Sequence, residues 1–125
     1  MKFKILIPVL FLLVTLHGCK KKKTQTTTGC TVVTVSSDIT TATSWTEGNV
    51  YIVDHTLSIT ATLTIQPGTI IKFTGGNGLK TLTNGVIQAE GTAAKPIIFT
   101  AYTDDSFCGD NNGDGNASSP AKGYW

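Results

Sequence analysis

Short apolar runs recur in this chain at a spacing of about 22 residues, and this recurrence limits most strongly what the chain can fold into. Leu57 and Leu79 lie 22 residues apart, and so do Ile65 and Ile87. Each copy then runs into an Ile-Ile pair, at 70–71 and at 97–98. A repeat of this length is typical of stacked structural units, each of which buries its apolar face against the next one.

The apolar runs predict β-strands, because no stretch shows helical periodicity and the runs are rich in Val, Ile and Thr. Turn sequences that contain Gly, Asn and Pro separate them. The predicted strands are Thr31–Val35, Val50–Val53, Leu57–Ile59, Leu63–Ile65, Thr69–Phe73, Leu79–Leu82, Val86–Ala89 and Pro96–Thr100.

Three strands per period predict an all-β right-handed parallel β-helix, a solenoid in which each coil stacks on the one before it. The first coil would cover 50–65, the second 70–89, and a third would open at Ile97. We expect an N-terminal cap over 29–48, with Trp45 as a lid on the first coil, followed by about two and a half coils. An antiparallel sandwich is the alternative fold.

Three segments resemble the opening coils of secreted right-handed parallel β-helix proteins, many of which are bacterial surface lipoproteins. These segments are Leu63–Phe73 (LTIQPGTIIKF), Gly85–Thr92 (GVIQAEGT) and Pro96–Ala101 (PIIFTA). The resemblance covers the chain from Trp45 to Trp125 and is specific for fold rather than activity. In that family the motif matched by Gly123-Tyr124-Trp125 leads into a further strand, so we expect this chain to be a fragment of a longer β-helix.

The N-terminus carries an export signal. Two Lys residues and an apolar run over 5–16, too short to span a bilayer as a helix, predict a signal peptide over 1–18. The segment Leu16-His17-Gly18-Cys19 resembles a bacterial lipobox, which implies cleavage before Cys19 and lipid on its thiol and new amino group. A plain cleaved signal with an incidental Cys19 is the alternative.

Residues 19–29 would then form a lipidated tether, in which Lys20–Lys23 lie beside anionic lipid headgroups. No Asp follows Cys19, and this favours the outer membrane or the cell surface as destination. From Thr24 onward four Lys face eight acids and there is no Arg. This mildly acidic body argues against binding to nucleic acid.

A polar insertion over 104–120 contains a candidate calcium loop. Asp110, Asn112 and Asp114 place oxygen-bearing side chains at every second position, and Gly115 follows the last of them. Loops that wrap Ca²⁺ use this spacing. The acid that closes an EF-hand loop is missing, because Ala121 stands in its place. An Asn/Asp/Gly turn without a metal is the other interpretation. The candidate ligands are Asp110, Asn112 and Asp114, with Asp104 and Asp105 as less favoured contributors.

Two cysteines, Cys30 and Cys108, remain if Cys19 carries lipid. Disulfides persist in the oxidising compartments that an exported chain reaches, so Cys30 and Cys108 could form a disulfide. Two free thiols are the alternative.

No catalytic residue is predicted. Asp54-His55 is the single acid–His neighbour pair, and adjacent residues on a strand point to opposite faces. Lys72 and Glu90 are isolated among outward-facing positions.

These features predict a lipid-anchored module of the cell envelope that is structural, adhesive, or binds a glycan or a surface protein. Its partners would be the membrane, through the lipid on Cys19, and such a surface ligand, with Ca²⁺ as candidate cofactor. The alternative is the N-terminal piece of a polysaccharide-degrading lyase or hydrolase whose active site lies beyond residue 125.

Overall fold

The computed structural model of this protein describes residues 29–115. The predicted signal peptide (1–18), residues 19–28 of the predicted tether (19–29) with its lipidation site Cys19, and the motif at 123–125 lie outside the described residues. Residues 29–115 form nine strands and no helix. The strands are β1 (Thr31–Val35), β2 (Thr43–Trp45), β3 (Asn49–Val53), β4 (Leu57–Ile59), β5 (Thr62–Ile65), β6 (Ile70–Phe73), β7 (Leu79–Thr81), β8 (Val86–Ala89) and β9 (Ile98–Ala101).

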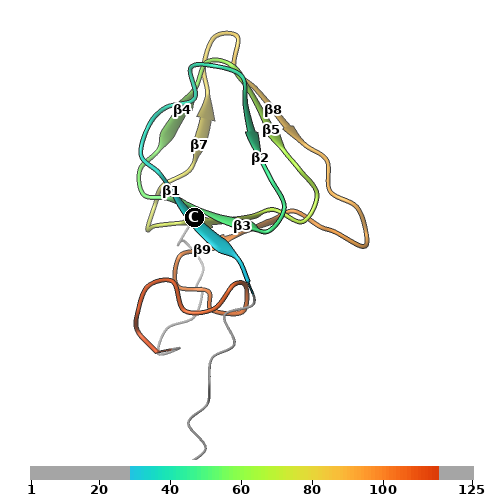
Figure 1. The fold of residues 1–125 in the computed structure, drawn as a ribbon. Coiled ribbons are helices and arrows are strands. Elements are labelled where there is room, and N and C mark those ends of the chain that lie inside the picture. The colour runs from blue at the N-terminus through green and yellow to red at the C-terminus, as the bar shows by residue number, and fades with distance from the viewer. Residues whose placement is uncertain (1–28, 116–125) are drawn as a thin grey trace, which may run out of the picture.

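All paired strands run parallel, in three sheets with the orders β1-β3-β6-β9, β2-β5-β8 and β4-β7. Parallel neighbours cannot be joined by a tight hairpin, so the chain visits the other sheets before it returns beside an earlier strand. In Figure 1 the sheets outline a triangle around a common interior. The prediction of an all-β protein built from parallel strands is confirmed, and this arrangement is compatible with a parallel β-helix-like fold.

The segment expected to be a cap contributes one strand or bridge to each of the three sheets, as the segments that follow it do. Its strand β1 pairs with β3, Ile39 makes an isolated parallel bridge to Ile59, and β2 pairs with β5. Trp45 lies within β2, is 3% exposed, and stacks on Tyr51 with ring centroids 4.7 Å apart, so it belongs to the interior.

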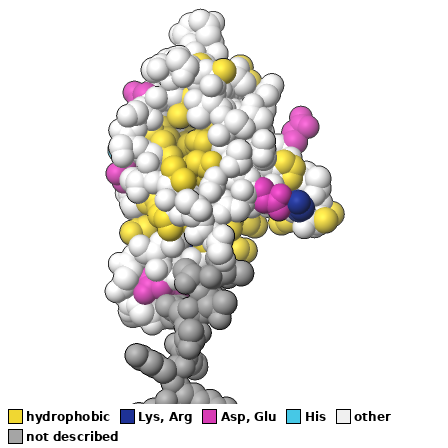
Figure 2. All heavy atoms as spheres, viewed as in Figure 1, with side chains coloured by type: hydrophobic (Ala, Val, Ile, Leu, Met, Phe, Trp, Pro, Cys, Tyr) yellow, Lys and Arg dark blue, Asp and Glu magenta, His cyan; other side chains and the backbone are white. Residues whose placement is uncertain are grey.

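The main apolar core lies inside the triangle. Strand alternation directs every second side chain of each sheet inward, and Figure 2 shows hydrophobic side chains filling the centre of the view. Leu57, Ile59, Leu63 and Ile71 have no exposed surface. Each buried aliphatic side chain of this size contributes about 1.5–3 kcal/mol relative to an exposed one.

A second, smaller core lies on the outer face of the four-stranded sheet. Val50 and Ile52 of β3 point outward yet are buried, together with Cys108 from the loop over 102–115 that follows β9. A disulfide joins Cys108 to Cys30, with the two Cα atoms 5.8 Å apart. Because the loop covers this face, β3 is buried on both sides, and its sequence NVYIV is accordingly almost continuously apolar.

Two turns repeat one hydrogen-bond pattern. In 46–49 (TEGN) and 74–77 (TGGN) the Asn side-chain amide donates to the Thr hydroxyl three residues earlier, at 2.8 Å in both turns. The third residue, Gly48 or Gly76, has a positive φ of 81° or 75°, which favours glycine. Asn77 also donates to the carbonyl of Asp54 at 2.9 Å, so this turn is attached to the one stacked beside it.

Candidate metal centre

The loop over 102–115 is held against the outer face of the four-stranded sheet by covalent and polar contacts. The disulfide at Cys108 attaches its middle. The hydroxyl of Tyr102 donates to the carbonyl of Asn111 at 2.6 Å and so closes the loop on itself. Cys108 has a positive φ of 56°, an uncommon conformation for a residue with a side chain. These contacts place an acidic segment directly over β6 and β9.

Three carboxylates converge in this loop. Asp105, Asp110 and Asp114 each offer one oxygen, and these oxygens all lie within 4.8 Å of one another. The Asp110 carboxylate also accepts backbone N–H bonds from Gly113 at 2.6 Å and Gly115 at 2.7 Å. It therefore folds 110–115 into a tight loop around its own charge.

Asp105 has the least satisfied carboxylate of the three. Both of its oxygens are buried and have no hydrogen-bond partner. Burial raises the pKa of this carboxyl group, the negative charges of Asp110 and Asp114 raise it further, and the positive charge of Lys72 opposes them in part. A buried anion without a partner is costly unless a cation or a proton neutralises it.

Lys72 provides one positive charge beneath the loop. It lies on β6 and has no exposed surface. Its ammonium donates to the carbonyls of Asp104 at 2.7 Å and Gly109 at 3.2 Å. Burial lowers the Lys72 pKa, and the neighbouring carboxylates of Asp105, Asp104 and Asp110 oppose that effect.

The expectation that Lys72 is an isolated outward residue is therefore wrong. Lys72 does occupy an outward strand position, but the loop folds back over it. An ammonium that is enclosed in this way and bonded to backbone carbonyls holds the loop in place and has no open side toward a substrate.

The two less favoured ligand candidates separate in the structure. Asp104 is 4% exposed. Burial would raise its pKa, but its carboxylate accepts hydrogen bonds from the Thr100 hydroxyl and from the Ser106 backbone at 3.0 Å, and these bonds, with the charge of Lys72, lower the pKa instead. The Asp104 carboxylate is thus occupied by hydrogen bonds to Thr100 and Ser106. Asp105 instead lies beside Asp110 and Asp114. Asn112 donates its side-chain amide to Asp114 at 2.8 Å and so belongs to the same loop.

This arrangement suits a hard divalent cation. Ca²⁺ takes oxygen ligands from carboxylates, amides and backbone carbonyls in flexible geometry, and the loop offers three carboxylates at close range. Sequence reasoning singled out two members of this carboxylate cluster, Asp110 and Asp114. It missed the burial of Asp105 and the position of Lys72, because both depend on how the loop packs against a distant strand.

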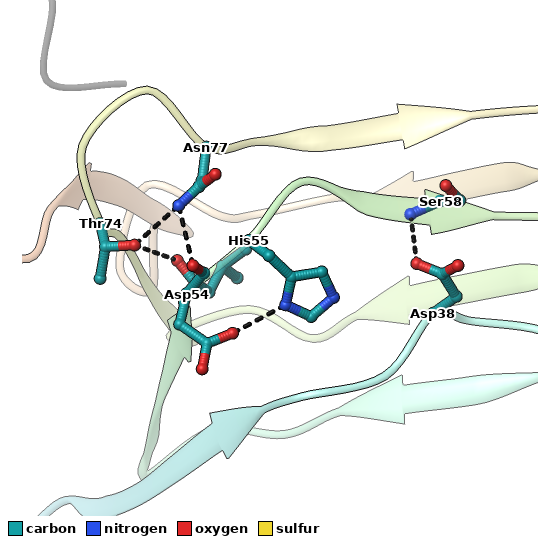
Figure 3. Close-up of polar contacts among 7 residues, drawn as sticks. Asp38, Asp54, His55, Ser58, Thr74 and Asn77 are labelled. Carbon is teal, nitrogen blue, oxygen red and sulfur yellow. Dashed lines mark hydrogen bonds and ion pairs between the residues drawn. The ribbon is translucent and has the colours of Figure 1, made fainter.

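Asp54 and His55 contact each other, contrary to the argument that neighbouring strand residues point apart. Figure 3 shows both in the turn that follows β3, where backbone alternation no longer applies; His55 Nδ1 lies 2.7 Å from Asp54 Oδ1. Both side chains are exposed. The backbone N–H of Ser58 donates to Asp38 at 2.8 Å, so Asp38 holds the stacked turn in place. The contacts drawn there lie in turns, except that Asp38 contacts Ser58 in strand β4 (Leu57–Ile59).

Comparison of the chain with protein-family models, with curated proteins and with solved structures finds no significant match. Within the described residues, no helix is long and apolar enough to cross a bilayer.

Proposed function

We propose that this chain is a lipid-anchored module of the bacterial cell envelope, built as a right-handed parallel β-helix and stabilised by Ca²⁺ in the loop over 102–115. The three parallel sheets and the strand order within them support the β-helix. Right-handedness rests on the general rule that parallel crossover connections are right-handed in about 98% of cases. The module would be structural or adhesive, or would bind a glycan or a surface protein.

The observation that carries the calcium site is the Asp105 carboxylate, which is buried without a partner beside two further carboxylates. The loop holds four Asp side chains against the single ammonium of Lys72. A divalent cation would supply both the missing charge and the missing partner for Asp105. Extracellular modules bind Ca²⁺ with dissociation constants of about 10⁻⁴–10⁻³ M, which suits a partly buried loop with three acidic ligands.

The lipobox-like segment that ends at Cys19 supports the anchor. Multiple acyl chains, each contributing about 0.8 kcal/mol per buried CH₂, would hold the protein on a bilayer, and the Lys residues that follow would lie against anionic headgroups. The Cys30–Cys108 disulfide supports export, since such bonds persist in oxidising compartments. The outer membrane or the cell surface is the proposed destination.

Calcium titration of the full-length mature protein tests the metal site. After chelation and dialysis, Ca²⁺ at ten times its dissociation constant should stabilise the fold by about 1.4 kcal/mol. For a domain of this size that raises the melting temperature by about 6–10 °C. Asp110→Asn should abolish the shift, whereas Asp54→Asn, an exposed carboxylate outside the loop, should retain it. Equal melting curves with chelator and with about 5 mM Ca²⁺ would remove the metal site from the proposal.

Mass spectrometry of the membrane-extracted protein tests the anchor. We expect a mature chain that begins at Cys19 and carries acyl groups, and we expect Cys19→Ala to release the protein from the membrane fraction. An unmodified Cys19 in the membrane-extracted protein would refute the lipid anchor.

A further inference from the structure

A groove on the outer face of the β2-β5-β8 sheet lies apart from the calcium loop. It has a volume of about 390 Å³. Its lining comes from β5, β8 and the ends of both strands: Thr64, Ile65, Gln66, Pro67, Gln88 and Glu90. We propose that this groove binds an uncharged glycan. The proposal deepens the module function above by giving it a ligand class and a place, and it rests on that function.

The polar lining suits a ligand that is rich in hydroxyl groups. Thr64 and Gln88 are register partners on adjacent strands, and the Thr64 hydroxyl donates to Gln88 Oε1 at 3.2 Å. This bond fixes the Gln88 carboxamide and leaves its NH₂ group to donate outward. Gln66 and Glu90 are exposed and add a second carboxamide and a carboxylate. Together these groups line one groove with hydrogen-bond donors and acceptors, as a sugar with neighbouring hydroxyls requires.

The apolar lining suits the carbon face of a sugar ring. Pro67 is half-buried at the groove and supplies this apolar surface, whereas the Ile65 side chain is 2% exposed and packs in the inner core behind the strand. The turn that carries Gln66 and Pro67 is held in place, because the Gln66 N–H donates to the Trp45 carbonyl at 2.9 Å and the Gly68 N–H to the Lys95 carbonyl at 3.1 Å. The groove is therefore formed before a ligand arrives, which lowers the entropic cost of binding.

Charge selects against acidic polysaccharides. The lining contains one carboxylate and no cationic side chain. The nearby Lys95 ammonium is already paired with the Glu47 carboxylate at 2.8 Å. An anionic sugar would meet Glu90 without a counter-charge, whereas an uncharged one would meet only hydrogen-bonding groups. Because the lining has no aromatic side chain for stacking, we expect a dissociation constant of about 1 mM for one site, which is useful when many anchored copies act together.

NMR titration of the ¹⁵N-labelled mature chain tests the groove, with glucose and N-acetylglucosamine oligomers as uncharged probes and a galacturonic acid oligomer as the acidic one. We expect the uncharged oligomers to shift the amide signals of Gln66, Gln88 and Glu90. Gln88→Ala, a change at an exposed position, should weaken binding by about three- to tenfold. Lys80→Ala, equally exposed on β7 in another sheet, should leave it unchanged.

Three results would overturn the proposal: no shift with either uncharged oligomer, tighter binding of the acidic one, or shifts at the groove caused only by a protein partner. The calcium melt and the membrane fractionation of the same Gln88→Ala variant separate this failure from failure of the module. If both stay normal while glycan binding is absent, only the groove proposal is wrong.

Discussion

Replacement of Gly85 by Ala tests the stacking of successive turns at a point where the structure leaves no space. A Cβ atom at Gly85 would lie 1.9 Å from the carbonyl oxygen of Ile59 and 2.8 Å from its carbon. Real Cβ atoms essentially never come closer than 3.0 Å, and the obstructing atoms are backbone, so the two turns must separate by about 1 Å.

That separation would break specific contacts. The Ile59 carbonyl accepts the N–H of Leu82 at 2.8 Å, and the Ile59 side chain has no exposed surface. Loss of the hydrogen bond costs about 1 kcal/mol, and forced separation of packed backbone adds about 1–3 kcal/mol. We therefore expect Gly85→Ala to lower the free energy of unfolding by about 2–4 kcal/mol, a large share of the roughly 5–15 kcal/mol available to a small domain.

Urea denaturation followed by circular dichroism measures this effect, with Gly78→Ala as the matched control. A Cβ atom at Gly78 meets nothing within 4 Å, and the φ of Gly78 lies outside the positive region. Gly78→Ala should change stability by less than about 1 kcal/mol, and a small gain is expected from the reduced entropy of the unfolded chain. If the two variants unfold within about 0.5 kcal/mol of each other, the stacking of these turns as described is incorrect.

Three further predictions concern the loop. In chelated buffer Asp105→Asn should stabilise the protein by about 1 kcal/mol, because it removes a buried charge without a partner, and it should abolish the Ca²⁺-induced shift; a destabilised variant in thermal melts would contradict this. In the same buffer, thermal melts should show that stability first rises as the pH falls from 7, because the folded pKa of Asp105 is raised and the folded state takes up this proton first. Below about pH 3.8 stability should fall, because the folded pKa of Asp104 is lowered and the unfolded state takes up that proton first. A monotonic loss of stability from pH 7 would count against that order. Reduction of the Cys30–Cys108 bridge, which spans 78 residues, should cost about 2–5 kcal/mol, and the double Ser variant should melt at the same temperature with and without reductant.

The stacking of turns was predictable where one side-chain type repeats at one face. Leu57 and Leu79, aligned from their spacing, are register partners in the β4–β7 sheet. The same reasoning aligned Ile65 with Ile87, but the structure pairs Ile87 with Leu63. A slip of two residues keeps every side chain on its own face of the sheet, so the apolar pattern alone cannot detect it.

At the last strand the predicted register differs from the observed one by one residue, and such a shift exchanges the inward and outward faces of the strand. The Ile-Ile pairs suggest that Ile70 aligns with Ile97, yet Ile70 pairs with Ile98. Phe99 therefore points inward, where it stacks on Phe73 with ring centroids 6.4 Å apart. The β2 strand was missed for a different reason. Its three residues, TSW, are too short and too polar to form an apolar run, and pairing with β5 defines the strand.

The candidate metal centre was predictable in its ligand types and not in its surroundings. The spacing over 110–115 indicates a cation loop, since ligand chemistry is local. Contacts between the loop and the sheet join residues far apart in sequence, such as Lys72 and Gly109, and no local pattern encodes them. The outward position of Lys72 on β6 follows from alternation, but its burial follows only from the loop that closes over it.

This packing makes the candidate metal centre part of the fold. The loop is attached to the four-stranded sheet by the disulfide, by the ammonium of Lys72 and by the Thr100–Asp104 hydrogen bond. If a cation neutralises Asp105 as proposed, the free energy gained would therefore stabilise β6 and β9 as well as the loop. A site with these attachments and an enclosed lysine is suited to holding the outer face of the sheet closed. In the module proposed above, contact with a surface ligand would instead involve the exposed side chains of the neighbouring β2-β5-β8 sheet.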